Sequence, residues 1–388
     1  MLAAIAAKQQ NPKKSVLIIE ALSKLGKKIL VSGNGRCNIL NAGAYQYFGD
    51  VAFAHQVLGE DAYQELKQVF QMLGLQIVIE SEDRAYPASF QAETVMDVLL
   101  LQIKRLQIDL RLNSPVLDIV KNNKEFQVHT KEESFACTKL IAAVGGIASP
   151  KHGSNGSLYP VLQRLGLKFH PSKPALCPLL TDTRDIHGLS GIRVRARVSL
   201  DSRYCSSGEV LFTDYGISGI AAMQLARYCT SGSVIHLDLR PACGLAEQGK
   251  DVLVSILSKR IKDYPMEDIP ALFSGLFCAK LGKAIFLKSG LTKKNITLMA
   301  IRRQDVAHLA DTIIRFELSV KGTKGYDFAQ VSTGGALCDQ FQPATMESST
   351  PGLYCTGEVL NVDGDCGGYN LMFAFKSGLL AGRHAAED

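Results

Sequence analysis

Residues 357–370 read GEVLNVDGDCGGYN and run directly into an apolar segment that we expect to be helical from about Gly368 to His384. Adjacent glycines at a helix start leave the first backbone N–H groups open to a ligand, and the helix dipole favours an anion there. The negatively charged edge of a reduced flavin suits that position, and Glu358 could accept hydrogen bonds from ribityl hydroxyls. A glycine-rich turn into a packed helix is the alternative.

A second glycine-rich segment, SGNGRCN at 32–38, combines a flexible backbone with a guanidinium and an amide. These groups suit a pyrophosphate and ribityl chain, because N–H donors and a planar cation can surround it. The doublet Gly145-Gly146 ends an expected strand and could let a nucleotide approach the backbone closely. By itself each segment could also be an ordinary surface loop.

The run SVLIIE at 15–20 is apolar and β-branched, which favours a buried parallel strand closed by Glu20. In dinucleotide-binding folds such an acid accepts hydrogen bonds from ribose hydroxyls about 20 residues beyond a G-x-G-x-x-G fingerprint. That spacing puts the fingerprint at or before Met1, and we expect the natural reading frame to begin about 15 to 20 residues upstream. An acid closing a strand by chance is the alternative for Glu20.

Length and composition describe an ordinary folded protein of 388 residues, enough for two or three domains. The net charge is 43 − 37 = +6, which favours anionic small molecules mildly and does not mark a dedicated nucleic-acid binder. The ten cysteines include no C-x-x-C pair, so we expect no metal site and a reducing, cytoplasmic location. No uncharged run reaches the ~18 residues of a membrane span, so we expect no membrane partner.

Hydrophobic periodicity predicts the remaining elements. Helical spacing is found at 1–10, 58–73, 91–107 and 245–310. Strand patterns are found at 115–120, 125–129, 139–144, 234–239 and 312–320, and a glycine-rich return follows at 331–335. Strict alternation at 192–200 indicates a half-buried antiparallel strand and, with it, a second domain after about residue 175.

Two basic features are interpreted as solvated faces. Arg193, Arg195 and Arg197 share one face of the strand at 192–200, and residues 280–304 contain seven Lys and Arg and no acid. Neither feature has interleaved aromatic residues, as nucleic-acid sites often do. Cys37 and Cys366 are interpreted as small buried apolar residues, because no paired spacing supports a dithiol relay.

Four stretches together resemble the aminoacetone-oxidase-like flavoproteins, the YhiN/BaiN group. They are LGKK at 25–28 leading into SGNGRCN, GEV at 357–359 leading into GGYN, FTDYGISG at 212–219 and PATMES at 343–348. The resemblance spans nearly the whole chain. Asn34 stands where a third glycine is usual, and Ile220 stands where proline usually follows Ser218-Gly219.

The resemblance implies an α/β fold with a Rossmann-like FAD-binding domain and inserted β-barrel-like and helical domains. The expected bounds are 1–170 and 331–388 for the FAD-binding domain, the first part lacking its first strand, 171–240 and 311–330 for the β domain, and 241–310 for the helical domain. FAD contacts carried over from the family fall on Glu20, Gly33, Arg36, Cys37, Asn38, Val116, Gly145, Gly146, Gly357, Glu358, Gly367, Gly368, Tyr369 and Asn370.

The function expected from these features is that of a FAD-dependent oxidoreductase acting on an unidentified small molecule. Dioxygen or transiently bound NAD(P)H would be the redox partner, since the chain has no second dinucleotide fingerprint. No catalytic residue is identified, and a nucleic-acid partner is not expected. The alternative is a degenerate, non-catalytic flavoprotein fold that binds a partner such as RNA; a nicotinamide-only dehydrogenase agrees less well with the glycine-rich loops.

Overall fold

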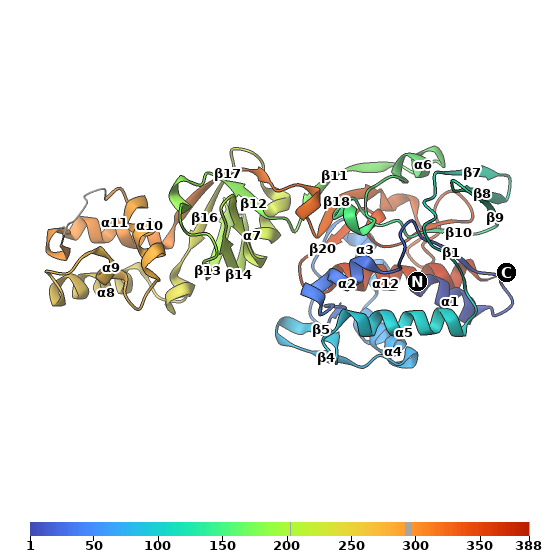
Figure 1. Ribbon diagram of the computed structural model, residues 1–388, viewed down its shortest axis with the longest axis horizontal. Coiled ribbons are helices and arrows are strands. Elements are labelled where there is room, and N and C mark those ends of the chain that lie inside the picture. Colours follow the sequence, from blue (N-terminus) through green and yellow to red (C-terminus); the bar gives the residue numbers. More distant parts are fainter. Residues whose placement is uncertain (202, 292–296, 388) are drawn as a thin grey trace. The chain divides into compact units, whose positions relative to one another are not determined.

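The computed structural model describes residues 1–201, 203–291 and 297–387, which form two compact units. Unit 1 consists of Met1–Lys173 and the chain's return from Gln330, and unit 2 is Pro174–Ala329. Figure 1 shows the blue and red ends of the chain together in unit 1. The fold is mixed α/β with a barrel, as predicted.

Unit 1 contains two parallel strand pairs. β1 (Leu17–Ile19) pairs with β6 (Asp109–Arg111), and β10 (Leu140–Ala142) pairs with β19 (Leu353–Cys355). The β-branched run at 15–20 therefore gives the parallel strand expected of it. In β19 all three residues are fully buried, as a strand covered on both faces requires.

Smaller sheets complete unit 1. β7, β8 and β9 form an antiparallel meander, while β2, β5 and β4 form a second antiparallel sheet. The pairs β20–β3 and β11–β18 join segments far apart in sequence. The bounds are β2 Leu40–Asn41, β3 Tyr47–Gly49, β4 Ile77–Ile79, β5 Arg84–Pro87, β7 Asp118–Asn122, β8 Glu125–His129, β9 Ser134–Cys137, β11 Phe169–Ala175, β18 Val331–Ala336 and β20 Val362–Gly364.

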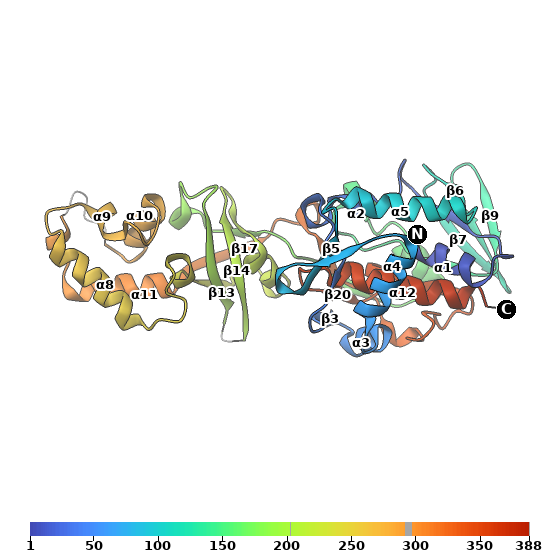
Figure 2. The same cartoon turned by 90° about the horizontal axis from the view of Figure 1, so that it is seen from below.

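The C-terminal helix α12 (Tyr369–Ala385) packs against α1 (Leu2–Gln10), and Figure 2 shows them side by side. Their backbones approach closely, because a Cβ on Gly382 would lie 2.1 Å from the Ala3 carbonyl oxygen. The helix expected at 58–73 begins only at Ala62, because Leu58 ends the preceding helix and Gly59 after it has a φ of +67°. The other helices are α2 Lys27–Val31, α3 Val51–Leu58, α4 Ala62–Leu73, α5 Ala92–Arg105 and α6 Tyr159–Arg164.

Unit 2 contains a closed barrel with the strand order β12-β15-β14-β13-β16-β17. β13 pairs antiparallel with both β14 and β16, and Ala196 and Val198 point inward between exposed arginines. The antiparallel strand predicted at 192–200 is confirmed. The bounds are β12 Leu179–Thr181, β13 Arg193–Leu200, β14 Tyr204–Phe212, β15 Gly216–Ser218, β16 Val234–Asp238 and β17 Phe316–Thr323.

Helices follow the barrel strands within unit 2. They are α7 Ile220–Leu225, α8 Lys250–Asp263, α9 Ile269–Phe273, α10 Ala279–Lys288 and α11 Arg303–Ile314. The strand expected to begin at Thr312 begins only at Phe316, because α11 continues through Ile314. Its apolar residues Leu309, Ala310 and Ile313 are buried, and their spacing fits one face of a helix and not the alternation of a strand.

A membrane-crossing helix must be both long and apolar, and no helix within 1–201, 203–291 and 297–387 meets both conditions.

Candidate functional site

The loop at 32–38 has an unusual backbone. Gly33, Asn34, Gly35 and Cys37 all have left-handed φ values, of +56°, +56°, +82° and +56°. The loop closes on itself, because the Arg36 N–H donates to the Gly33 carbonyl (3.2 Å) and the Cys37 N–H donates to the Ser32 carbonyl (3.0 Å). Asn34 replaces the family's glycine at a left-handed position, and asparagine is among the non-glycine residues that best tolerate it. The departure at Asn34 therefore preserves the loop conformation.

Two side chains of this loop have different surroundings. The Arg36 guanidinium lies 4.7 Å from the ring centre of Tyr86 and 4.6 Å from that of Phe90, so aromatic faces hold an exposed planar cation in place. Cys37 is fully buried, and burial raises the pKa of its thiol to about 11. Cys37 can therefore offer a ligand its backbone but not a thiolate.

The start of α12 is fixed by neighbouring segments. The buried Asn41 side chain donates to the Gly367 carbonyl (2.8 Å), and Tyr47 donates to the Tyr369 carbonyl (2.8 Å). Asn370 binds both the N–H and the carbonyl of Gly364, each at 2.8 Å. The side chain of Asn370 thus holds the preceding loop in shape, and Tyr369 is buried beside Tyr47.

Gly368 lies where this helix start meets the loop at 32–38. A Cβ on Gly368 would lie 2.3 Å from the Leu40 carbonyl oxygen and 2.8 Å from Asn38 Oδ1. Its φ of +97° also disfavours any side chain. Asn38 Oδ1 is buried and has no hydrogen-bond partner among the described residues. A buried acceptor without a partner costs free energy, which suits a position where a ligand supplies the donor.

Glu358 joins three further segments. Its Oε2 pairs with Lys28 Nζ of α2 at 2.7 Å, and its Oε1 accepts from the backbone N–H of Ser332 at 2.8 Å. Ser332 Oγ donates to Oε1 (3.0 Å) and accepts from the Ile147 N–H (3.1 Å). Both carboxylate oxygens are therefore already engaged by protein groups.

The glycine doublet at 145–146 lies against this network. A Cβ on Gly146 would lie 2.3 Å from Glu358 Oε1, so glycine is needed there for internal packing. Gly145 has a φ of +71° and faces Ser154 Oγ, which also accepts from Lys28 Nζ at 3.3 Å. Gly357, with a φ of +72°, donates its N–H to the buried Ser377 Oγ at 3.0 Å and so ties the same turn to α12.

His152 adds a second buried atom without a partner beside these loops. Its Nδ1 has no hydrogen-bond partner among the described residues. Burial lowers the pKa of His152, and Lys151, Lys28 and Lys27 lower it further. The imidazole is therefore held toward its neutral form.

Glu20 and Val116 come from neighbouring segments. Glu20 follows β1, its Oε1 accepts from the Leu22 N–H at 2.9 Å, and its carbonyl accepts from Ser114 at 2.9 Å. Val116, two residues after Ser114, packs against the core. A Cβ on Gly153 would lie 3.0 Å from Leu22 Cδ1, so this group adjoins the loop that carries Ser154. All the predicted positions therefore lie within unit 1.

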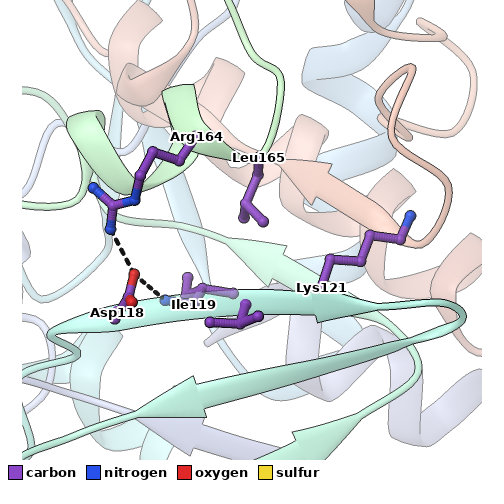
Figure 3. A pocket seen from close by; sticks show the side chains of 6 residues that line it. Asp118, Ile119, Lys121, Arg164 and Leu165 are labelled. Atoms are coloured by element: carbon purple, nitrogen blue, oxygen red, sulfur yellow. Dashed lines mark hydrogen bonds and ion pairs between the residues drawn. The ribbon is translucent and has the colours of Figure 1, made fainter.

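A surface pocket of unit 1 lies away from the residues predicted to contact FAD. It has a volume of about 350 Å³ and is lined by residues of β7 and α6, with Arg164 and Asp118 paired at 2.6 Å (Figure 3). None of the residues predicted to contact FAD lines it. Its ion pair is exposed, so it has the character of a surface depression.

Comparison with known proteins defines the class. The model of the HI0933-like protein Rossmann domain matches residues 1–384. A 3-dehydro-bile acid delta(4,6)-reductase of Clostridium scindens is 32% identical over 100% of this chain and 96% of its own length. A ribosomal RNA dihydrouridine synthase of Escherichia coli is 26% identical over 93% of this chain and 90% of its own length.

Solved structures agree at the level of fold. A 3-ketosteroid-delta4-(5alpha)-dehydrogenase from Rhodococcus jostii covers the whole chain and 94% of its own, with a TM-score of 0.51 and 13% identity. The fold and the family match together define a FAD-dependent oxidoreductase, which confirms the predicted class and cofactor. The chain belongs to the HI0933-like Rossmann family.

Several residues of this site were not identified from the sequence. Lys28 lies in the LGKK stretch at 25–28, yet nothing there indicated that its ammonium group contacts both Glu358 and Ser154. Asn41 and Ser332 lie outside every motif. Only three-dimensional contacts identify these residues. Lys28 and Asn41, for example, bind Glu358 and Gly367, which lie more than 300 residues away in the sequence.

Proposed function

We propose that this protein reduces a carbon–carbon double bond conjugated to a carbonyl, with FAD held by unit 1 and NAD(P)H as the transient electron donor. The observation that carries the proposal is the chemistry shared by its relatives. One relative is a delta(4,6)-reductase and another makes dihydrouridine, which differs from uridine by two hydrogens across a ring double bond conjugated to a carbonyl. In both cases a hydride and a proton add to an electron-poor double bond.

The residues of unit 1 fit the cofactor. The left-handed glycines of the loop at 32–38 would let the pyrophosphate and ribityl chain approach the backbone closely, and the exposed Arg36 guanidinium would neutralise a phosphate. The buried Asn38 Oδ1 would accept a hydrogen bond from a flavin N–H. The positive end of α12 would stabilise negative charge on the reduced ring. Bound FAD supplies hydride transfer, which side chains alone cannot perform.

Other predicted contacts divide into two roles. Within the part of the chain that the structure describes, one carboxylate oxygen of Glu20 has no hydrogen bond, and it would accept from ribose hydroxyls. Glu358, Gly146 and Asn370 would act through the backbone they hold in place, since their own groups are engaged within the protein. Lys28 and Ser332 are then positioning residues for the same loops.

Overall, the proposed reaction consumes NAD(P)H, a proton and the double bond and yields NAD(P)⁺ and the saturated product. The test supplies purified, FAD-loaded protein with NADH or NADPH and either a steroid 4-en-3-one or a uridine-containing RNA. We expect nucleotide oxidation that depends on one of these acceptors, with mass spectrometry showing a gain of two hydrogens. Oxidation of NAD(P)H that depends only on dioxygen, with the steroid and the RNA both unchanged, would contradict the proposal and favour an oxidase.

A further inference from the structure

The protein's net positive charge falls in one unit. Residues Pro174–Ala329 of unit 2 contain 21 Lys and Arg against 15 Asp and Glu, a net charge of +6. The rest of the chain contains 22 of each, a net charge of zero. The charge of the whole chain is therefore that of the inserted unit, and a polyanion would be attracted to unit 2.

The arginines of β13 provide part of this charge on one face of the barrel. Arg193, Arg195 and Arg197 are all exposed, and Glu209 is the acid that faces them from β14. Glu209 pairs with Arg193, although its register partner is Arg195. Asp238, opposite Arg197 on β16, is already bound by Arg240 at 2.6 Å. The three arginines on this face of β13 are therefore only partly neutralised by the acids that face them.

A groove lies beside this row within unit 2. It has a volume of about 600 Å³ and is lined by β13 residues on one side and by the segment between α9 and α10 on the other. Arg193 and Arg195 supply its charged lining, while Leu276, Phe277 and Leu281 supply apolar lining. A groove of this kind can hold phosphates beside the flat faces of sugars or bases.

Helix α10 begins at this groove and adds further cations. Lys280 and Lys283 are exposed and three residues apart, so they are neighbours on the helix surface, while Leu281 and Ile285 are buried. No ion pair involves Lys280 or Lys283 within the described residues, whereas Lys288 pairs with Asp185 at 2.5 Å. The first turn of α10 contains no acid, so its positive dipole end is not neutralised locally.

We propose that this basic groove, lined by Arg193 and Arg195, binds the sugar-phosphate backbone of RNA. Arg197, next on the same face of β13, and Lys280 and Lys283, in the helix that begins beside the groove, would extend its positive charge. Several separated cations beside an apolar channel fit a chain of phosphates. The proposal rests on the function proposed above and names its substrate class: a uracil base within RNA. Such a base must be unstacked to be reduced, so single-stranded RNA is the expected ligand.

The test measures the affinity of the FAD-loaded full chain for a fluorescein-labelled, uridine-rich single-stranded RNA by anisotropy at several salt concentrations. The groove variant is Arg195→Glu/Lys280→Glu/Lys283→Glu. The matched control is Lys104→Glu/Lys124→Glu/Lys131→Glu, which makes the same charge change with three exposed lysines of unit 1. We expect the groove variant to lose roughly tenfold or more in affinity and the slope of log K against log salt to fall by about 2, since each lost phosphate contact removes about 0.7.

Two results would overturn the assignment. Equal losses in the groove variant and the control would show a general charge effect, and a groove variant that binds RNA normally but no longer binds a steroid carboxylate would make the groove a small-molecule site. Reduction of a steroid 4-en-3-one is measured in parallel on the same variants. If no protein, wild type included, reduces the steroid, the proposed reduction of such a small enone is contradicted. The RNA-binding result would still stand.

Discussion

Asn38 provides the sharpest residue-level prediction, because its Oδ1 is buried without a partner. We expect Asn38→Ala to leave the flavin-free protein as stable as wild type or slightly more stable, since an unsatisfied buried acceptor costs about 1–3 kcal/mol. FAD affinity should fall roughly tenfold, the value of about one hydrogen bond. Urea unfolding and flavin titration measure the two effects, with the exposed Asn122→Ala as the control. A variant that binds FAD as tightly as wild type would remove Asn38 from the site.

Cys37 gives a prediction about pH. Because burial raises the pKa of its thiol to about 11, the folded protein keeps the thiol protonated where an unfolded chain would ionise it near the ordinary value of 9.0. Its contribution to stability is complete below pH 9 and is lost as the pH rises toward 11. At pH 8 we expect iodoacetamide to label the exposed Cys205 and Cys278 and to spare Cys37. Peptide mass mapping checks this, and rapid labelling of Cys37 would show that its burial is wrong.

At the scale of elements, the start of α12 depends on Gly368. Gly368→Ala must place a Cβ about 2.3 Å from the Leu40 carbonyl oxygen in a left-handed conformation. Gly74→Ala is the matched control, since Gly74 is also left-handed, with φ +103°, but has open space around its Cβ. The control should lose about 1–2 kcal/mol of unfolding free energy, the cost of the backbone conformation, and Gly368→Ala clearly more. Equal losses would mean that α12 begins differently.

Elements also show how far the sequence could predict the molecule. The glycine doublet predicted the start of α12 within one residue, and the β-branched run predicted β1. The β17 start was missed because Ile313 and Ile314 fit a strand and a helix equally well until the burial of α11 is known. The Lys28–Glu358–Ser332 network could not be predicted, since its members share no local motif. The domain bounds and the FAD contacts remain predictions.

At the scale of the whole molecule, we expect unit 1 to hold FAD without help from the arginines of unit 2. Changing Arg193, Arg195 and Arg197 together to Ser should leave FAD content unchanged, because all three lie in unit 2. Substitution should not unfold the barrel, since these side chains are exposed on β13. Flavin absorbance per protein after purification measures the result. Loss of flavin in a folded triple variant would mean that unit 1 does not hold FAD by itself.

The central claim is that the protein uses FAD to reduce a conjugated double bond, and a single-turnover experiment tests it most directly. The FAD-loaded protein is reduced without oxygen and then mixed with a uridine-containing RNA or a steroid 4-en-3-one, while the visible absorbance of oxidised flavin is followed. The account predicts that one acceptor restores the oxidised spectrum and gains two hydrogens per flavin. Flavin that stays reduced with both acceptors, yet reoxidises at once with dioxygen, would contradict it.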